Sequence, residues 1–235
     1  MAFLRRLVDD FRSGESYALV LALLLASLVV GIAAPETTWA RVIRDVVLSV
    51  TIVVSYWTAT RRRASVLPGA LWPSIALVFV LVGALEGART HAVTAAIGAV
   101  LVGIVAFLVT RDLLRRGRVS RQTVFGALSL YVLLGMFFGF VYMFIADITD
   151  AAFFAHGDDG TSGEHLYYSF VAISTTGFGD LAPATGIGRA LTVLEIVLGQ
   201  LYLVTVVAVL VTTAAGHRGR PPAGAASTTE RGDPA

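Results

Sequence analysis

Long apolar runs separated by short polar segments dominate this chain. A helix needs about 20 predominantly apolar residues to cross the hydrocarbon core of a bilayer. Six runs approach that length, and the third is the shortest. They cover Tyr17 to Ala34, Val42 to Thr60, Ala70 to Leu85, Ala92 to Thr110, Val124 to Ala146 and Ile187 to Thr213. The pattern predicts an all-α membrane protein with six transmembrane helices.

A shorter apolar stretch, Glu164 to Ser174, lies between the fifth and sixth runs. Its length of about eleven residues is too short to cross a bilayer and fits a re-entrant helix. Residues 175–180 then read T-T-G-F-G-D, and Pro183 follows. Irregular backbone at membrane depth is tolerated only where protein surrounds it or where it lines a water-filled cavity. We therefore expect a re-entrant helix that leads into a loop beside an aqueous path.

The composition excludes several classes of protein. Of 235 residues, 56% are apolar and 14% charged, whereas soluble domains are about 45–50% apolar and about 25% charged. A soluble enzyme, a disordered chain and a nucleic-acid binder are all poor fits. Cysteine is absent, and the four histidines show no metal-ligand spacing. The runs also lack paired Asp, Ser-His or His-Glu arrangements. We expect no enzymatic activity and no cofactor.

The distribution of charge predicts the orientation in the membrane. All basic side chains are arginine, and fourteen of the eighteen precede the first run or follow the second, fourth and sixth runs. Cytoplasmic loops carry an excess of Arg and Lys, so these segments and both termini should be cytoplasmic, in a multi-pass protein of the cell membrane. Acidic residues occupy the opposite loops. These are Glu36, Asp147, Asp150, Asp158, Asp159 and Glu164.

The region Val124 to Val211 resembles the pore domain of potassium channels. Its T-T-G-F-G-D segment is similar to the T-V-G-Y-G filter of that family, with Thr176 in place of Val and Phe178 in place of Tyr. Phe178 lacks the hydroxyl that in the family bonds to aromatic side chains of the pore helix. The resemblance implies a passive potassium-selective channel, and because each chain supplies a quarter of each filter ring, a homotetramer.

The resemblance also assigns roles within the filter. Backbone oxygens of Thr175, Thr176, Gly177 and Phe178 would bind K⁺ in place of its water shell. Inward carbonyls require left-handed backbone at alternate positions, which explains Gly177 and Gly179. The negative end of the preceding helix would favour a cation in the cavity. The side chain of Asp180 would add negative charge at the outer mouth.

The last run carries three further expectations. The pattern Pro183-x-Thr185-x-x-Gly188-Arg189 resembles the family's connection from filter to inner helix. Gly199 falls where the family places its gating hinge, although close helix packing explains a helical glycine equally well. By the family's alignment the following side chains line the cavity. They are Gln200, Leu203 and Val207.

Glu195 is an ionisable residue inside a membrane span, which makes it a functional-site hypothesis by default. One interpretation is a buried carboxyl group that supports the filter, since the family's pore-helix carboxylate is replaced here by Val171. The other is a protonated or Arg-paired structural residue. In the fifth run, Gly135 and Gly139 form a G-x-x-x-G pair, which we expect to seat this helix against the inner helix.

The run Ala92 to Thr110, the fourth of the peripheral helices, carries no arginine, so opening of the channel should depend weakly on voltage.

We divide the chain into five parts. The parts are an N-terminal cytoplasmic or interfacial segment (1–16), a four-helix peripheral domain (17–110), a cytoplasmic linker (111–121), a pore domain (122–213) and a disordered cytoplasmic tail (214–235).

Several alternatives remain open. The linker arginines could contact anionic lipids or simply follow the positive-inside rule. His165 could sense external pH or be a solvated loop histidine. The rival functions are a non-selective monovalent cation channel on the same fold and, more remotely, a potassium uptake transporter subunit, although such transporters carry four filter segments per chain. The linker arginines are Arg111, Arg115, Arg116, Arg118 and Arg121.

Overall fold

The computed structural model describes residues 17–60, 88–116 and 120–218, and these form six helices. Within these ranges there is no strand, only an isolated bridge between Phe154 and Pro183, which confirms the all-α prediction. The helices are α2 (Tyr17–Ala33), α3 (Thr38–Thr60), α5 (Ala88–Arg116), α6 (Arg121–Ile148), α7 (Ser162–Ile173) and α8 (Gly186–Arg218). The predicted span Ala70 to Leu85, the segment 1–16 and residues 219–235 lie outside the described residues.

Four of these helices contain a stretch that is long and apolar enough to cross a membrane. The stretches are Thr38–Thr60, Thr90–Arg115, Arg121–Ile148 and Gly186–Val206. The helix α2 is also apolar, but with 17 residues it is shorter than these four helices. Such helices are typical of a membrane protein, in which every backbone N–H and C=O must be bonded within its own segment.

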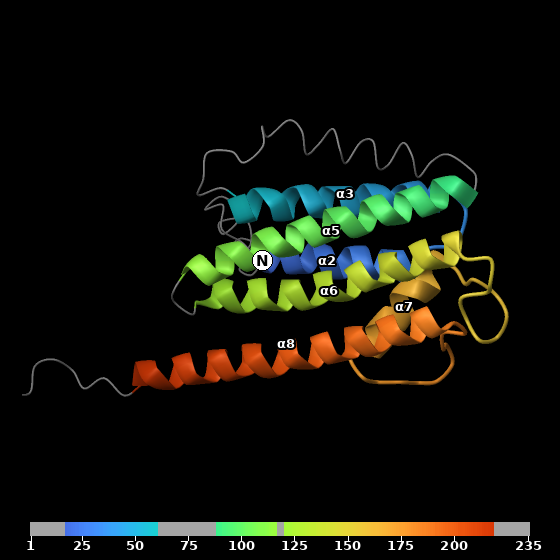
Figure 1. Ribbon diagram of the computed structural model, residues 1–235. Helices are drawn as coiled ribbons and strands as arrows, with labels where there is room; N and C mark the ends of the chain where they lie inside the picture. The colour runs from blue at the N-terminus through green and yellow to red at the C-terminus, as the bar shows by residue number, and fades with distance from the viewer. Residues whose placement is uncertain (1–16, 61–87, 117–119, 219–235) are drawn as a thin grey trace, which may run out of the picture.

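The long helix α6 lies at the centre of the bundle. It packs against α2, α5, α7 and α8, while α3 packs against α2 and α5 (Figure 1). Its buried side chains include Leu133 and Met136, which join Val20 of α2 and Val102 of α5 in one apolar core. The helix α8 runs along the side of the bundle opposite α3 and contacts α6 and α7. This arrangement sets the short α7 between the bundle and α8.

Two helices run further than the sequence predicts. The helix α5 continues to Arg116, so Arg111 and Arg115 belong to its last turns. Ser120 then caps α6, with its side chain accepting a hydrogen bond from the Thr123 backbone N–H. At the other end of the chain, α8 continues to Arg218, beyond the predicted end at Thr213.

The beginning of α2 is bonded to the junction of α5 and α6. The Tyr17 backbone N–H donates to Gln122 Oε1 at 2.8 Å, and its hydroxyl donates to Asp112 Oδ2 at 2.7 Å. Tyr17 has no exposed surface. These two bonds hold the start of α2, the end of α5 and the start of α6 at one end of the bundle.

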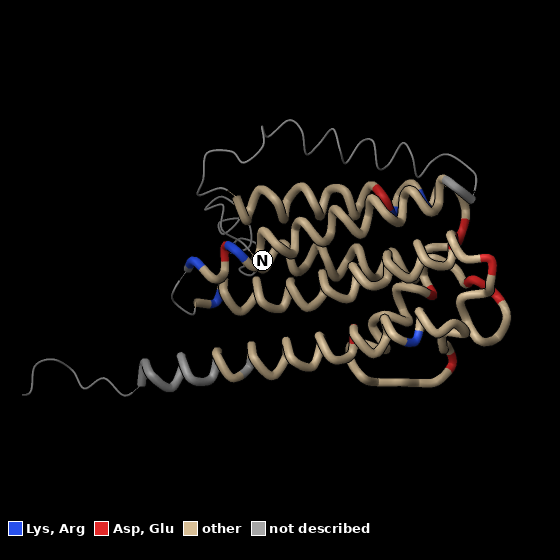
Figure 2. The backbone as a smooth tube through the Cα atoms, in the orientation of Figure 1, with Lys and Arg blue, Asp and Glu red and all other residues tan. Residues whose placement is uncertain are grey.

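Charged residues lie mostly toward the two ends of the bundle. Figure 2 shows basic residues where α5 ends and α6 begins, and acidic residues in the loops at the end where α7 begins. The grouping agrees with the charge pattern expected from the sequence. It places the acidic loops on the same side as the start of α7.

Candidate functional site

The short helix α7 begins with a capping box. The Thr161 side chain accepts from the Glu164 backbone N–H at 3.2 Å, and the Glu164 Oε2 atom accepts from the Thr161 N–H at 2.6 Å. The latter bond lowers the pKa of the Glu164 carboxyl group. The helix therefore starts at Ser162, two residues before the predicted start at Glu164. The T-x-x-E spacing was the sequence signal for this boundary.

The other end of α7 closes with a Schellman motif that leads into residues 175–180. The Thr176 N–H donates to the Val171 carbonyl at 3.0 Å, and the Thr175 N–H donates to the Ala172 carbonyl at 2.9 Å. Thr175 stands where glycine is usual, with φ of +56°. A positive φ at a β-branched residue is strained by about 1–3 kcal/mol. The helix end thus turns the chain sharply into the T-T-G-F-G-D segment.

Left-handed backbone recurs at every second position of this segment. Gly177 has φ of +59° and Gly179 has φ of +82°, following Thr175. The two glycines have the conformation that the sequence predicted, whereas the positive φ of Thr175 was not anticipated. No heavy atom lies within 4 Å of a Cβ built on Gly177 or Gly179. Residues 174–180 are all exposed in the single chain, so this segment borders open space.

Phe178 and Asp180 are both held by one side chain of α7. The Tyr167 hydroxyl donates to Asp180 Oδ2 at 2.8 Å. The Tyr167 ring stacks on Phe178, with centroids 6.5 Å apart and planes 2° from parallel. Tyr167 therefore contacts Phe178 through its ring and Asp180 through its hydroxyl. Tyr167 is a site residue that the sequence analysis did not single out.

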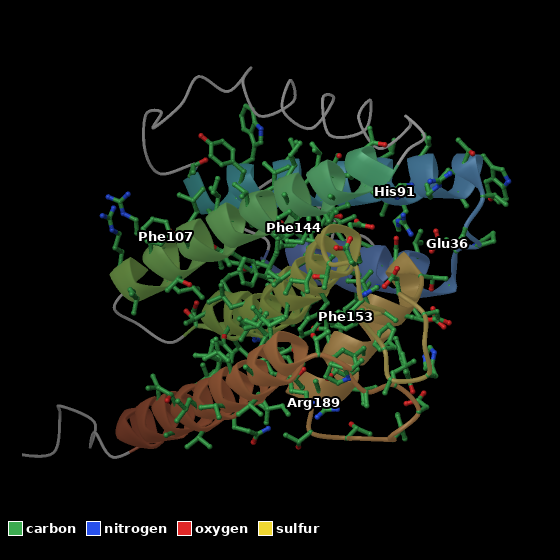
Figure 3. The ribbon with its side chains drawn as sticks, turned by 45° about the vertical axis from the view of Figure 1, so that its right-hand side comes forward. Glu36, His91, Phe107, Phe144, Phe153 and Arg189 are labelled. Carbon is green, nitrogen blue, oxygen red and sulfur yellow. The ribbon has the colours of Figure 1, made fainter. Side chains whose placement is uncertain are left out.

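The chain after Asp180 is fastened to the loop that follows α6. The Ala155 N–H donates to the Ala182 carbonyl, and the Ala184 N–H to the Phe153 carbonyl, each at 2.8 Å. Phe153 and Phe154 are almost fully buried. Their rings pack against Tyr168 of α7. Figure 3 shows Phe153 on the same side of the molecule as the start of α8. The sequence analysis missed both phenylalanines because the loop around them is polar.

Glu195 of α8 is completely buried between α6 and α7. Its Oε2 atom accepts a hydrogen bond from the Tyr142 hydroxyl of α6 at 2.6 Å. Its Oε1 atom lies within hydrogen-bonding distance of the Ser169 hydroxyl of α7. The same Ser169 oxygen is 2.6 Å from the Gly135 carbonyl of α6. One carboxyl group thus joins the three helices directly behind the T-T-G-F-G-D segment.

The two glycines of the G-x-x-x-G pair do not face α8 as predicted. A Cβ on Gly135 would meet the Phe170 ring at 2.8 Å, and one on Gly139 would meet Leu166 at 2.8 Å. Both partners belong to α7. The close approach that these glycines permit is therefore between α6 and α7, because α7 fills the space that the prediction gave to α8.

Gly199 contacts the end of α7. A Cβ at this position would lie 2.5 Å from Ile173 Cγ1 and 3.1 Å from the Ile173 carbonyl oxygen. This contact supports the packing interpretation of Gly199, while its role as a hinge stays a prediction. Gln200 and Leu203 are half-buried in the single chain. The side chain of Val207 lies outside what the structure describes.

His165 is not a solvated loop histidine. It lies in the first turns of α7 with only 2% of its surface exposed, and its ring packs against Phe153 and Phe154. Its Nδ1 atom is 2.8 Å from the Thr161 carbonyl oxygen. Since a carbonyl only accepts, Nδ1 carries the proton in this bond. Burial lowers the pKa of this imidazole.

A cavity of about 270 Å³ is lined by residues of α2, α3, α5 and α6 and by the start of α7. Glu36 and His91, which line it, lie at the same end of the bundle (Figure 3). Arg41 Nη1 is 3.1 Å from His91 Nε2, and Arg44 pairs with Glu36 at 3.6 Å. In the part of the chain that the structure describes, no group of three or more His, Asp or Glu residues is arranged to hold a metal ion.

Comparison with known proteins identifies the region that contains this site. Residues 126–215 match the model of a family described as ion channel. The match spans most of α6, all of α7, the T-T-G-F-G-D segment and nearly all of α8. Neither the curated proteins nor the solved structures gave a match. Residues 126–215 are thus an ion channel domain, consistent with the resemblance to potassium-channel pore domains, and a channel domain favours transport over enzymatic activity.

Proposed function

We propose that the protein is a passive, potassium-selective channel made of four identical chains in the cell membrane. Each chain crosses the membrane six times with both termini in the cytoplasm, and α7 re-enters the membrane as the pore helix. The segment 175–179 forms the selectivity filter. The permeating ion is the only small ligand required.

The backbone of residues 175–179 carries this proposal. The segment alternates between left-handed and ordinary backbone, with positive φ at Thr175, Gly177 and Gly179, and this alternation is what a strand requires to aim successive carbonyl oxygens to one side. A K⁺ ion that leaves water needs such oxygens in place of its hydration shell. The end of α7 lies directly before this segment, and the partial negative charge of its last carbonyls favours a cation nearby.

Assembly into a tetramer is supported by the exposed surface of α8. Its membrane-length stretch is only 17% buried within the single chain, whereas that of α6 is 61% buried. Val193, Leu201 and Val204 are each 60% exposed or more. Residues 174–180 are also exposed in the single chain. Three further copies would cover part of α8 and complete each ring of filter oxygens.

The composition of the peripheral helices indicates that opening of the channel depends weakly on voltage. The stretch Ala92 to Thr110 of α5 contains no arginine or lysine, so it has no gating charge for the membrane potential to move. The cytoplasmic arginines around the junction of α5 and α6 are proposed to contact anionic lipid headgroups. Of these, Arg111, Arg115, Arg116 and Arg121 belong to described helices.

Reversal potentials in liposomes test the proposal. With KCl on one side and NaCl on the other, the purified protein should give currents that reverse near the potassium equilibrium potential. A reversal near zero would identify the non-selective cation channel instead.

Sedimentation in detergent tests the oligomeric state and should show a tetramer. A monomer that still conducts would contradict a pore shared by four chains.

The variant Gly177→Ser connects conduction to the filter. The space around Gly177 accepts a side chain, but its φ of +59° does not suit one. We expect tetramers without potassium current. Gly186→Ser is the matched control, because Gly186 also borders open space but has no positive φ. Normal current in Gly177→Ser would show that conduction does not pass through this segment.

A further inference from the structure

The contacts around Ser169 and Glu195 constrain where protons lie behind the filter. Ser169 Oγ is 2.6 Å from the Gly135 carbonyl oxygen and also within hydrogen-bonding distance of Glu195 Oε1. Tyr142 Oη is 2.6 Å from Glu195 Oε2. All four residues are buried. Each of the three short contacts needs its own proton, because two oxygens at this distance without a proton between them repel each other.

The available protons decide between the two forms of Glu195. A hydroxyl donates one hydrogen bond, and a carbonyl oxygen donates none. If Glu195 is ionised, Ser169 and Tyr142 supply two protons to three contacts, so one short oxygen–oxygen contact has none. If Glu195 carries a proton on Oε1, it donates to Ser169, Ser169 donates to Gly135, and Tyr142 donates to Oε2. Only the protonated acid satisfies all three contacts.

The surroundings of Glu195 also disfavour a negative charge. The residue has no exposed surface, and among the described residues no arginine forms an ion pair with it. The titratable groups that face it are tyrosines, namely Tyr131 and Tyr142 from α6 and Tyr168 from α7. A buried carboxylate without a cation is much less favourable than its neutral form, because its charge loses the water that would solvate it.

We propose that Glu195 is a protonated carboxylic acid at neutral pH and acts as a neutral positioning residue that holds α6, α7 and α8 together behind the filter. This inference rests on the proposed function for its effect on conduction, but not for the proton itself. Glu195 touches Ser169 in the middle of α7, whose last residue precedes the filter by two positions. Loss of the proton leaves a short repulsive contact at this point and loosens α7 against α6.

Infrared spectroscopy of the full-length protein tests the protonation without any measurement of current. The difference spectrum between wild type and Glu195→Gln at neutral pH should contain the C=O stretch of a protonated carboxylic acid. Glu36→Gln is the matched control, since Glu36 is exposed and should contribute carboxylate bands only. Carboxylate bands in the Glu195→Gln difference spectrum would overturn the proposal.

The wild-type protein provides a second readout in case the variant does not assemble. Labelling of glutamate with ¹³C at the carboxyl carbon shifts only the glutamate bands, which separates Glu195 from the buried Asp45. A shifted acid band at neutral pH that disappears at alkaline pH supports the proposal. If no acid band shifts on labelling, Glu195 is ionised.

The pH profile of conduction tests the positioning role. A Gln side chain can donate through its N–H₂ group to Ser169 and accept from Tyr142, which repeats the bonds of the neutral acid. Glu195→Gln should therefore conduct as the wild type does at neutral pH and keep that current at alkaline pH, where the wild-type current is lost. Equal alkaline loss in both proteins would exclude this role. If the wild-type protein shows the acid band but does not conduct, the proposed function is contradicted, while the assignment of the proton to Glu195 still holds.

Discussion

The Tyr167 hydroxyl donates a 2.8 Å hydrogen bond to Asp180 Oδ2, and this bond joins the middle of α7 to the last residue of the T-T-G-F-G-D segment. The same ring stacks on Phe178. A single side chain of α7 therefore contacts the T-T-G-F-G-D segment in two ways. Phe178 contributes only its ring to this arrangement, and the hydroxyl comes from Tyr167.

Removal of that bond should reduce conduction and leave assembly intact. Tyr167→Phe keeps the ring that stacks on Phe178 but loses the donor to Asp180. Asp180→Asn weakens the same bond from the other side, since an amide oxygen is a poorer acceptor than a carboxylate. We expect a lower open probability in each variant, measured in single-channel recordings.

The double variant is the control for this prediction. If the two residues act through their shared hydrogen bond, Tyr167→Phe combined with Asp180→Asn should be no worse than the more affected single variant. Additive losses would mean that Tyr167 and Asp180 influence the filter separately.

Gly199→Ala should destabilise the protein through contact with Ile173. The new Cβ would lie 2.5 Å from Ile173 Cγ1, and such overpacking costs about 1–3 kcal/mol. Thermal unfolding of the protein in detergent should show a lower midpoint. Gly186→Ala, which adds a methyl group in open space, should leave the midpoint nearly unchanged.

Truncation of the partner separates packing from hinge motion. Gly199→Ala combined with Ile173→Ala should recover part of the stability lost by Gly199→Ala alone, because the clashing Cγ1 atom is removed. If the variant is stable but its opening is impaired whether or not Ile173 is truncated, Gly199 acts as a hinge.

Acid should weaken the start of α7 through Glu164. The hydrogen bond from the Thr161 N–H lowers the pKa of the Glu164 carboxyl group below its ordinary value of 4.5. The stabilisation is therefore present above about pH 4.5 and is lost as the pH falls through the lower pKa of the folded state. Hydrogen exchange of the first turn of α7 should accelerate over this range.

Glu164→Gln isolates this acid effect. Glutamine also completes a capping box but does not titrate, so this acid-dependent exchange should disappear. Thr161→Ala, in contrast, removes the cap at every pH and should cost about 1 kcal/mol. An unchanged acid response in Glu164→Gln would assign it to another group.

His165 should make the protein less stable as the pH falls below about 6.5. Burial lowers the pKa of its imidazole from the ordinary value of 6.5, so the unfolded chain binds a proton at a higher pH than the folded protein does. Stability is full above the unfolded pKa and declines as the pH drops toward the folded pKa. Thermal unfolding measured at pH steps from neutral to about pH 5 should show this decline.

His165→Asn tests the origin of that decline. The asparagine amide can replace the Nδ1–H donor to the Thr161 carbonyl, and it does not titrate. The variant should be less stable at neutral pH because it fills less space beside Phe153, but its unfolding should lose this pH dependence. A decline of equal size in the variant would exclude His165 as its cause.

Much of the architecture follows from sequence patterns with a local physical cause. The apolar runs locate α2, α3, α5, α6 and α8 to within several residues, because a lipid-exposed helix must be apolar over its whole length. The left-handed backbone at Gly177 and Gly179 was predictable, since only glycine adopts it without strain. The T-x-x-E spacing at the start of α7 likewise identifies the two residues that cap this helix.

The errors concern contacts between segments far apart in the chain. Gly135 and Gly139 were expected to face the inner helix and instead face α7. The interpretation of His165 as a solvated loop histidine is wrong, because Phe153 and Phe154 cover it. In each case the residue type shows that a close approach or a polar partner is needed. It does not show which segment provides it.

The amino-acid sequence alone predicts an apolar, helical chain with one channel-like segment, because helix length, apolar runs and glycine conformation are local properties. What surrounds that segment follows from the packing of the helices. This packing places Thr175 at a positive φ, Tyr167 on Asp180, and Glu195 between Ser169 and Tyr142. These relationships depend on how α6, α7 and α8 pack, and packing brings together residues whose separation along the chain carries no sign of their contact.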